Sequence, residues 1–353
     1  MYASVDMKLM SHLEIKESRI PKYRQIVDGV IEGVTNGHLQ IDEKIPSINA
    51  LSESYGLSRD TVEKAYNILK QRKVITSVKG KGFYITRTPL IGKINVLFLI
   101  NKLSTYKMQI YNAFVKQIGT SAHVDLHVYH CDESLFLNLL KKSAAVYDHI
   151  VVMPHFKSSS SRHVSATDSV ERALDRIAAS KVLLLDNNLI RLTHEHAEVY
   201  QDFEADIYTA LKEGHDKIKR YSKAILVYPM HAIYPYPKRI LHGFRRFCSE
   251  VRLPFEVIDE VYEDTVLHEG DLFITIAETD LVNLVKQVRD KGLTVGKDIG
   301  IISYNDTPLK DLLGITVMST DFDTMGSTAA RLVIEKRIEQ VQNPFRLIER
   351  ESL

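Results

Sequence analysis

Tryptophan is absent from this sequence of 353 residues, cysteine occurs twice, and no apolar run is long. The longest apolar runs, Val96–Ile100 and Val182–Leu185, are far shorter than the roughly 20 residues of a membrane-spanning helix. The start of the chain lacks the basic stretch and apolar core of a signal peptide. Cys131 and Cys248 are too few for a disulfide framework. These absences predict a protein of the reducing cytoplasm that does not interact with a membrane.

Acidic residues are missing from one long segment, because none occurs between Lys64 and Val124. The whole chain has a formal net charge of +1, but residues 1–90 hold 14 Lys and Arg against 10 Asp and Glu. A basic end on a slightly acidic remainder indicates a polyanionic partner such as nucleic acid. A solvated charged face would produce the same composition, so charge alone does not decide.

Signatures of catalytic chemistry are also missing. No GxGxxG motif follows an expected strand and no GxxxxGK[ST] motif occurs, so a nucleotide site is not predicted. His123, His127 and Cys131 share one face of an expected strand, but His130 points away, which argues against a metal site. No nucleophile is visibly paired with a base. We therefore expect no cofactor, no metal and no enzymatic activity.

Apolar residues recur at helical spacing near the start of the chain. The stripe Tyr23–Val34 predicts a first helix, with Gly37 as its C-terminal left-handed residue. Ser47 is placed to cap a short second helix that ends at Gly56, and Ser58 is placed to cap a third. Two short helices separated by a glycine-containing turn predict a helix-turn-helix.

Two short strands, Val74–Val78 and Phe83–Thr86, are expected next, joined by Lys79-Gly80-Lys81-Gly82. The tip of this hairpin is basic and rich in glycine, which lets the backbone turn tightly and approach a phosphate chain. The order of three helices and a hairpin predicts a winged helix-turn-helix domain over residues 1–88.

The segment Tyr23–Ile85 resembles the DNA-binding domain of the GntR family. The shared motifs are Tyr23-Arg24-Gln25-Ile26, Ile45-Pro46-Ser47, Leu51-Ser52-Glu53, Gly56-Leu57-Ser58-Arg59-Asp60-Thr61-Val62 and Gly80-Lys81-Gly82-Phe83. Asn49 departs from the family, because an arginine that contacts the operator is common at this position. Asparagine can still bond adenine or a phosphate.

The resemblance implies double-stranded operator DNA as the partner and two helix starts and the hairpin tip as the contact surface. The implied DNA-binding residues are Ser47, Asn49, Ser58, Arg59, Thr61, Lys64, Lys79, Gly80, Lys81 and Gly82. For the two serines, helix capping is the alternative role, and a winged helix can also serve as a protein-interaction module.

From Lys93 onward, apolar strands alternate with amphipathic helices. The expected strands are Ile94–Ile100, Val124–Tyr129, Ile150–Met153, Val182–Leu185, Ala224–Tyr228, Phe255–Ile258, Leu272–Ile276 and Ile299–Tyr304. The expected helices are Tyr106–Ile118, Leu135–Val146, Ser169–Ala179, Phe203–Lys219, Lys238–Glu250, Asp280–Lys291 and Met325–Ile338. This alternation predicts doubly wound parallel sheets in two similar lobes over residues 94–353, after a linker at 89–93. Ligands of such sheets lie at the carboxyl ends of the strands, so two facing lobes predict a cleft.

The second half of this region resembles the sugar-responsive effector domains of the lac-repressor family, which are related to periplasmic sugar-binding proteins. The motifs are the segments Gly296–Pro308, Ile315–Asp321 and Leu347–Ser352, together with Gly326. A GntR-like domain joined to such a domain is similar to the regulators of the arabinose-repressor type.

The second resemblance implies a polyol site at the strand ends. Asp186 matches a strand end whose aspartate bonds ligand hydroxyls, and Asn305 stands where the family has aspartate. The implied ligand-binding residues are Tyr106, Asp186, Arg239, Thr279, Asp280, Asn305 and Thr320. Planar donors and acceptors suit a polyol. The alternative role of Asp186 and Asp280 is to cap a strand end or a helix.

Taken together, the patterns and the two resemblances predict a cytoplasmic transcriptional repressor of carbohydrate-utilisation genes. A small sugar or sugar phosphate between the lobes would control operator affinity, and a homodimer would bind a near-palindromic site. Two other classes stay open. One is a GntR fusion to a pyridoxal-phosphate aminotransferase-like domain, and the other is a sugar-binding transport component.

Overall fold

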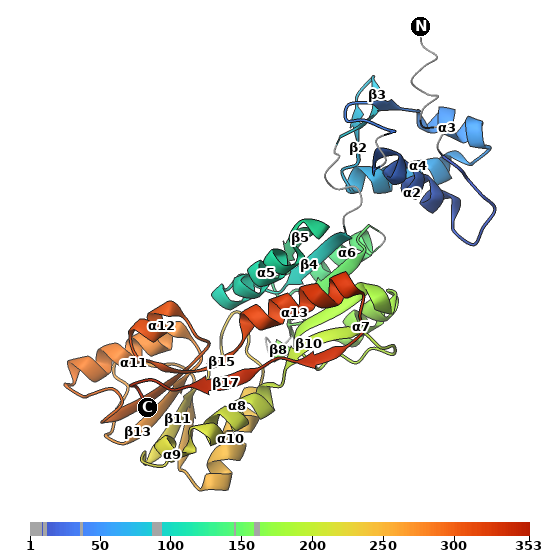
Figure 1. Ribbon diagram of the computed structural model, residues 1–353. Helices are drawn as coiled ribbons and strands as arrows, with labels where there is room; N and C mark the ends of the chain where they lie inside the picture. Colours follow the sequence, from blue (N-terminus) through green and yellow to red (C-terminus); the bar gives the residue numbers. More distant parts are fainter. Residues whose placement is uncertain (1–8, 10–12, 36–37, 87–93, 145, 159–162) are drawn as a thin grey trace. The chain divides into compact units, whose positions relative to one another are not determined.

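The computed structural model describes residues 9, 13–35, 38–86, 94–144, 146–158 and 163–353 of the chain (Figure 1). The predicted linker at 89–93 and the predicted helix end at Gly37 lie outside the described residues. Among the described residues, no helix combines the length and the apolar composition that crossing a bilayer requires.

The N-terminal domain has the predicted winged helix-turn-helix fold. Its helices are α2 (Lys22–Thr35), α3 (Ile48–Tyr55) and α4 (Arg59–Gln71). Its antiparallel sheet has the order β1-β3-β2 and consists of β1 (Lys44–Ile45), β2 (Ile75–Val78) and β3 (Gly82–Ile85). The hairpin β2–β3 is the predicted wing. The two-residue strand β1 was not expected, because so short a strand leaves no alternating pattern.

The apolar stripes that predict these helices meet in one core. Val27, Val62, Tyr66 and Leu69 are completely buried in it. The Tyr66 hydroxyl donates a hydrogen bond of 2.7 Å to the Pro46 carbonyl, and its ring packs edge-on against Phe83 with centroids 4.9 Å apart. One buried side chain thus ties the turn before α3 to the wing.

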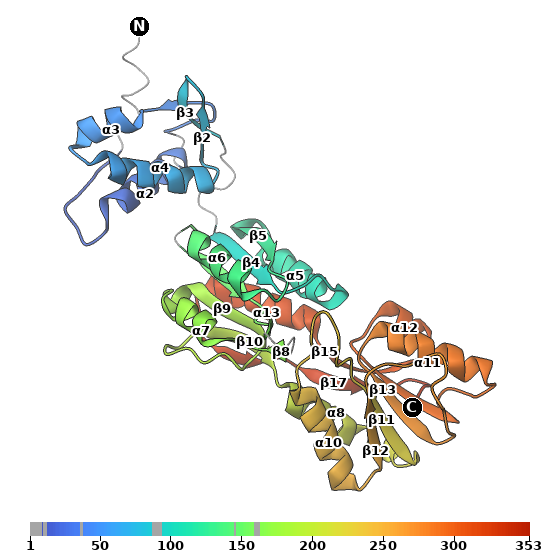
Figure 2. The ribbon, with the colours of Figure 1, turned by 180° about the vertical axis from the view of Figure 1, so that it is seen from behind.

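The C-terminal domain contains two six-stranded sheets, each the centre of one lobe (Figures 1 and 2). The first-lobe sheet has the order β16-β10-β9-β6-β4-β5. Its strands are β4 (Ile94–Ile100), β5 (Ala122–Val128), β6 (His149–Val152), β9 (Val182–Asn187), β10 (Ala197–Gln201) and β16 (Gln340–Gln342). The first lobe also has α5 (Thr105–Ile118), α6 (Glu133–Ser143), α7 (Asp168–Asp175), two 3₁₀ turns (Gly119–Ser121 and Ala179–Lys181) and a small hairpin, β7 (Phe156–Lys157) and β8 (His163–Val164).

The second-lobe sheet has the order β12-β11-β13-β14-β15-β17. Its strands are β11 (Lys223–Val227), β12 (Phe255–Ile258), β13 (Asp271–Thr275), β14 (Ile299–Tyr304), β15 (Thr316–Thr320) and β17 (Phe345–Ile348). Its helices are α8 (Phe203–Glu213), α9 (His215–Ile218), α10 (Arg239–Val251), α11 (Glu278–Asp290) and α12 (Pro308–Leu312). Strand β17 runs antiparallel to β15, and the other pairings in this sheet are parallel. The prediction of doubly wound parallel sheets in two lobes is confirmed.

One predicted helix is divided in two. The helix expected over Phe203–Lys219 ends at Gly214, and α9 begins immediately afterwards. A Cβ atom at position 214 would lie 2.6 Å from the Cδ2 atom of Leu347, so β17 approaches the chain at the break. The helix ends here because of contact with β17, a strand more than a hundred positions later in the sequence. Local periodicity therefore cannot predict this boundary.

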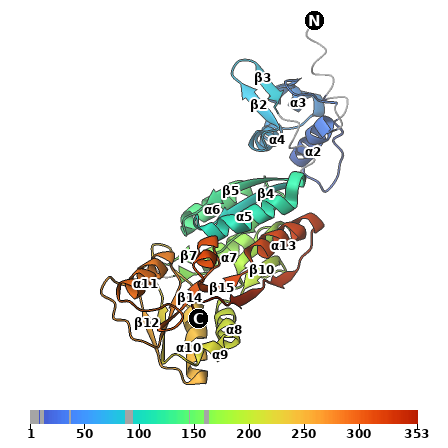
Figure 3. The same cartoon turned by 60° about the vertical axis from the view of Figure 1, so that its left-hand side comes forward.

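The chain crosses between the lobes three times: from β10 to α8, from β15 to α13 (Phe322–Glu335) and from β16 to β17. The alternation of elements predicted that the last helix belongs to the second lobe. This prediction is wrong, because that helix, α13, packs beside α5 in the first lobe (Figures 1 and 3). The approach is close: a Cβ atom at Gly326 would lie 2.2 Å from the Ile110 carbonyl oxygen.

Asn343 fastens the three crossings together. Its backbone N–H donates to the Tyr200 carbonyl at 2.7 Å, at the end of β10. Its side-chain amide donates to the Thr320 hydroxyl at 2.9 Å and to the Asp321 carbonyl at 2.8 Å, at the end of β15. Because Asn343 itself lies between β16 and β17, this one buried residue bonds the third connection to the other two.

Candidate functional site

The hydroxyl groups predicted to contact DNA cap the two helices of the helix-turn-helix. Ser47 Oγ accepts a hydrogen bond from the Ala50 N–H at 3.1 Å, and Ser58 Oγ accepts one from the Thr61 N–H at 3.2 Å. The hydroxyl of Thr61 lies 2.7 Å from that of Ser58. Capping accounts for both serines, and their contacts with DNA stay predictions.

The other predicted DNA-binding residues are on the surface. Asn49, Arg59, Lys79 and Lys81 are exposed. The ammonium group of Lys64 lies 3.9 Å from the centroid of the Tyr23 ring, a cation–π contact that fixes its position against α2. The exposed cations stand at the start of α4 and at the tip of the wing, where a phosphate backbone could reach them.

The tip of the wing needs glycine. Gly80 has φ +75° and Gly82 has φ +110°, values that side chains rarely adopt. A Cβ atom at Gly82 would also lie 3.1 Å from Cε of Lys44, so this lysine of β1 lies beside the wing. Lys44 is a further exposed cation of this surface that the sequence did not single out.

In the C-terminal domain, Asp186 lies at the carboxyl end of β9 and is 1% exposed. The carboxylate accepts hydrogen bonds from Lys107 Nζ at 3.1 Å and His155 Nε2 at 2.7 Å, and a third from the amide of Gln201. We call Lys107, His155, Asp186 and Gln201 the buried network. Both carboxylate oxygens are therefore engaged, and Asp186 lies behind His155 and Gln201 instead of on the wall of the cleft.

The electrostatics of the buried network hold it in one ionisation state. Burial alone would raise the pKa of Asp186, but the charge of Lys107 and the hydrogen bonds of His155 and Gln201 outweigh burial and leave this pKa well below its usual value. Burial and the nearby Lys107 charge lower the pKa of His155. The network thus contains an ionised Asp186, its Lys107 partner and a neutral imidazole.

The cleft between the strand ends is narrow. It encloses about 60 Å³, far less than the roughly 300–1,000 Å³ of ligand pockets. Tyr106 and Asn305, two of the predicted ligand residues, line it from opposite lobes. The ring of Tyr106 packs against that of Phe322, with centroids 5.1 Å apart. The structure brings these two predicted residues together, and their contact with a ligand stays a prediction.

The remaining predicted ligand residues do not line this cleft. Arg239 donates to Asp202 at 2.7 Å and lies 3.6 Å from Glu204, so ion pairs hold it on the α8 side. Thr320 donates to the Pro344 carbonyl at 3.1 Å and is part of the crossings that Asn343 joins. Thr320 does not line the cleft, because its hydroxyl is bonded at the crossings, and its contact with a ligand stays a prediction.

Thr279 and Asp280 lie in the first turn of α11 and line a separate depression. Asp280 is 5% exposed and accepts a hydrogen bond from the Val261 N–H at 2.9 Å. Burial raises the pKa of this carboxyl. This hydrogen bond fits the alternative role of Asp280 as a structural acceptor, and its contact with a ligand stays a prediction.

Among the cleft residues that the sequence did not single out, three matter for its chemistry. His155 and Gln201 are the members of the buried network that line the cleft. Lys102 also lines it and lies 5.4 Å and 5.0 Å from the ring centroids of Tyr234 and Tyr236 of the other lobe. His155 follows the strand β6 and its proline, a strand-end position of the kind that singled out Asp186. That signal was present, whereas nothing in the local pattern marks Lys102.

Two family models match the chain. Residues 22–85 match the bacterial regulatory proteins of the gntR family, and residues 211–353 match the periplasmic binding protein-like domain. Together the matches cover the winged domain and much of the second lobe.

Curated relatives match a short part of the chain. The chain is 35% identical over 65 residues to the mannosyl-D-glycerate transport/metabolism system repressor MngR of Escherichia coli, covering 18% of this chain and 27% of that protein. It is 30% identical over 73 residues to the arabinose metabolism transcriptional repressor of Geobacillus stearothermophilus, covering 21% of this chain and 20% of the relative. The chain thus spans about a quarter of the length of these relatives.

Solved structures match about three quarters of the chain. The dimeric Lac repressor has a TM-score of 0.57 at 14% identity and covers 73% of this chain and 98% of its own. The trehalose repressor of Escherichia coli has a TM-score of 0.56 at 16% identity and covers 72% of this chain and 100% of its own. At these identities the likeness shows the fold. The chain therefore joins a winged helix-turn-helix domain that matches the gntR family model to a two-lobed domain that matches the periplasmic binding protein-like model and has the fold of LacI-type regulators.

Proposed function

We propose that the chain is a transcriptional repressor of carbohydrate-utilisation genes. The observation that carries the proposal is the presence, in one chain, of a helix-turn-helix with exposed cations and a two-lobed domain whose strand ends face a cleft. The names of the relatives support it, since two are repressors of mannosyl-D-glycerate and arabinose metabolism.

On the DNA side, α4 enters the major groove and the wing contacts the backbone. Arg59 contacts a base edge or a phosphate at the start of the recognition helix α4, and Lys81 neutralises a phosphate.

A twofold dimer presents two such domains to a near-palindromic operator. Leu309 and Leu312 of α12 support an interface between copies, because they are 51% and 82% exposed.

On the ligand side, a small sugar or sugar phosphate binds between the lobes and favours one lobe angle. The space of about 60 Å³ at the strand ends requires the lobes to move apart before a sugar can enter there. The three crossings fastened by Asn343 provide the pivot. Ligand and operator then compete through their different affinities for two lobe arrangements.

The two other classes have less support. An aminotransferase-like domain would differ in fold from the two six-stranded sheets of this chain. A transport component would not need the winged domain. A repressor without catalytic activity, located in the cytoplasm, accounts for both domains.

The test uses the full chain. Double-stranded oligonucleotides that it retains are selected from a random pool, and binding to the selected sequence is then measured by fluorescence anisotropy with and without monosaccharides and their phosphates. We expect a near-palindromic sequence and a sugar-dependent change in its affinity. Retention of no sequence over random DNA would contradict DNA recognition, and unchanged affinity across all sugars would contradict control by a carbohydrate.

A further inference from the structure

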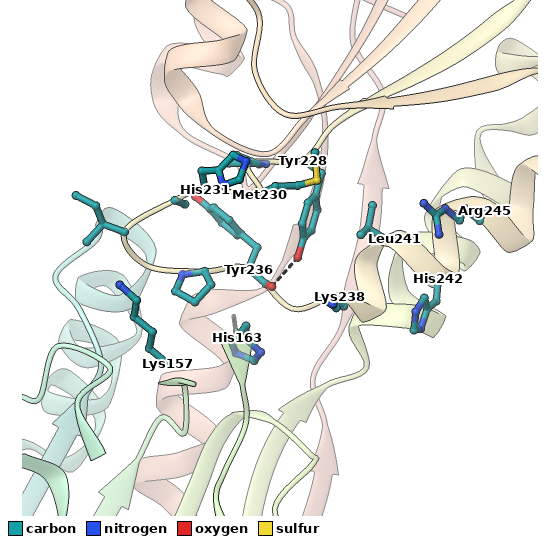
Figure 4. Close-up of a pocket in the computed structure, with 14 residues that line it drawn as sticks. Lys157, His163, Tyr228, Met230, His231, Tyr236, Lys238, Leu241, His242 and Arg245 are labelled. Carbon is teal, nitrogen blue, oxygen red and sulfur yellow. Dashed lines mark hydrogen bonds between the residues drawn. The ribbon is translucent and has the colours of Figure 1, made fainter. Parts of the chain in front are cut away.

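A second and larger cavity of about 780 Å³ shares Pro235 and Tyr236 with the narrow cleft (Figure 4). Its walls come from the loop that follows β11, from α10 and from the β7–β8 hairpin. We call it the basic cavity, because none of its described lining residues is acidic and six carry a cation or an imidazole. These are Lys157, His163, His231, Lys238, His242 and Arg245.

The cations come from both lobes. Lys157 and His163 lie on the β7–β8 hairpin of the first lobe, which Phe156 anchors by packing against Tyr129 and Phe136, with 5.1 Å between ring centroids in each pair. Lys238, His242 and Arg245 follow one another at intervals of four and three residues, which places them on one face at the start of α10 in the second lobe.

These charges have few partners of opposite sign. In the described part of the chain, Lys157, Lys238 and Arg245 form no ion pair, and the nearest carboxylate to His242 is that of Glu204 at 3.9 Å. Like charges on two facing walls repel each other, and an anion between them removes that repulsion. A bound anion would therefore favour the lobe angle that brings the two walls together.

A chain of hydrogen bonds connects the basic cavity to the buried network. His163 Nε2 lies 2.8 Å from His155 Nδ1, and His155 Nε2 lies 2.7 Å from Asp186. The ionised Asp186 only accepts, so His155 donates to it from Nε2 and accepts at Nδ1, and His163 must donate from Nε2. Burial lowers the pKa of His163 to about 3, which keeps it neutral. Its Nδ1 is then a hydrogen-bond acceptor suited to a hydroxyl group.

We propose that the basic cavity binds a sugar carrying a phosphate ester. The phosphate lies among Lys157, Lys238 and Arg245, and a sugar hydroxyl donates to His163 Nδ1. A phosphate monoester matches three cations better than a singly charged carboxylate does. As an effector site the cavity rests on the repressor function proposed above, but its ligand preference can be measured without DNA.

The first measurement is isothermal titration of the full chain at two salt concentrations. The probes are glucose 6-phosphate, fructose 6-phosphate and ribose 5-phosphate, each with its free sugar, together with glucuronate. We expect at least one phosphate to bind about tenfold or more tightly than its free sugar, the scale of one charge-assisted hydrogen bond, and to weaken as salt rises.

The second measurement repeats the titration with variants of each wall. Lys157→Gln and Arg245→Gln should each weaken binding of the phosphate about tenfold. The matched controls are Lys116→Gln in the first lobe and Lys286→Gln in the second, both exposed and away from the cavity, and they should bind as wild type does. All four substitutions are at exposed positions, and equal thermal unfolding temperatures would confirm that each variant folds.

Three results would overturn the proposal: no sugar phosphate binds, a free sugar or glucuronate binds as tightly as any phosphate, or the wall variants bind as the controls do. Failure of the repressor function gives a different result, namely phosphate binding that depends on Lys157 and Arg245 in a chain that recognises no DNA sequence. If a neutral sugar alone releases the operator, the repressor function stands and the proposal that the basic cavity binds a sugar phosphate as effector is wrong.

Discussion

Charged side chains have different surroundings in the two domains. In the winged domain, Arg59, Lys79 and Lys81 are exposed and form no ion pair among the described residues. In the two-lobed domain, Lys107 and Asp186 are 0% and 1% exposed and bond to each other. Exposed charge remains available to a polyanion, whereas buried charge already has its partner and can act on a ligand only through its neighbours. Four substitutions test this difference, and their expected effects decrease from Asp186→Ala through Arg59→Ala and Glu198→Gln to Lys81→Ala.

Asp186→Ala should have the largest effect, a loss of about 3–5 kcal/mol in the free energy of unfolding of the two-lobed domain. The substitution leaves Lys107 buried without a counter-charge and removes the acceptor of His155 and Gln201. Chemical denaturation of the full chain measures it.

The control is Asp168→Ala, in the exposed first turn of α7, where the loss should stay below about 1 kcal/mol. Equal losses in the two variants would show that Asp186 contributes no more than an exposed carboxylate. If the Asp186→Ala variant is stable but its operator affinity no longer changes with a sugar, the carboxylate contacts the ligand instead.

Arg59→Ala should weaken binding to the selected operator by about 1–3 kcal/mol and relax the base preference at one position. The reason is that an exposed guanidinium at the start of the recognition helix can bond a base edge in two places. Anisotropy with the operator and single-base variants measures it. Equal weakening on every sequence would assign Arg59 to a phosphate.

Glu198→Gln tests a buried carboxyl that forms no ion pair with any described residue. Glu198 is 4% exposed on β10, and burial raises its pKa to about 7. Between pH 4.5 and about 7 the folded state keeps a proton that the unfolded chain releases, so this group lowers stability as pH rises. The substitution should therefore raise the free energy of unfolding on the order of 1 kcal/mol at pH 8 and little at pH 4.5. An equal change at both pH values would contradict the pKa shift.

Lys81→Ala should have the smallest effect, a loss of less than about 1 kcal/mol in DNA affinity that is the same for operator and random DNA. The slope of log affinity against log salt should become shallower by about one unit, because one phosphate contact disappears. Titration at four salt concentrations measures the slope. An unchanged slope would show that Lys81 at the tip of the wing does not contact a DNA phosphate.

The sequence predicts the elements best where the signal is local. The strands β4, β12 and β14 have the bounds expected from apolar runs, and the caps at Ser47 and Ser58 lie where predicted. Strand β10 was not expected, because its polar residues Glu198 and Gln201 break the apolar pattern.

The candidate ligand site could be predicted only in part. Strand ends identified Asp186 and Asn305, and the structure places them in different lobes as expected. Whether such a side chain faces the cleft depends on partners far away in the chain. Lys107 precedes Asp186 by 79 positions, and Thr320 is bonded by Asn343, which belongs to a later crossing. No local spacing contains that information.

The three crossings also fix the order in which the lobes can be completed during synthesis. Ribosomes release the N-terminal end first. The second-lobe strands β11 to β15 are all made before α13 and β16, which the first lobe still lacks. Until residue 340 emerges, β10 has no partner on its outer side, and an unpaired strand edge can recruit another chain. The lobe that begins first therefore stays incomplete while β11 to β15 of the second lobe are made, and the nascent chain carries an open sheet edge during that interval.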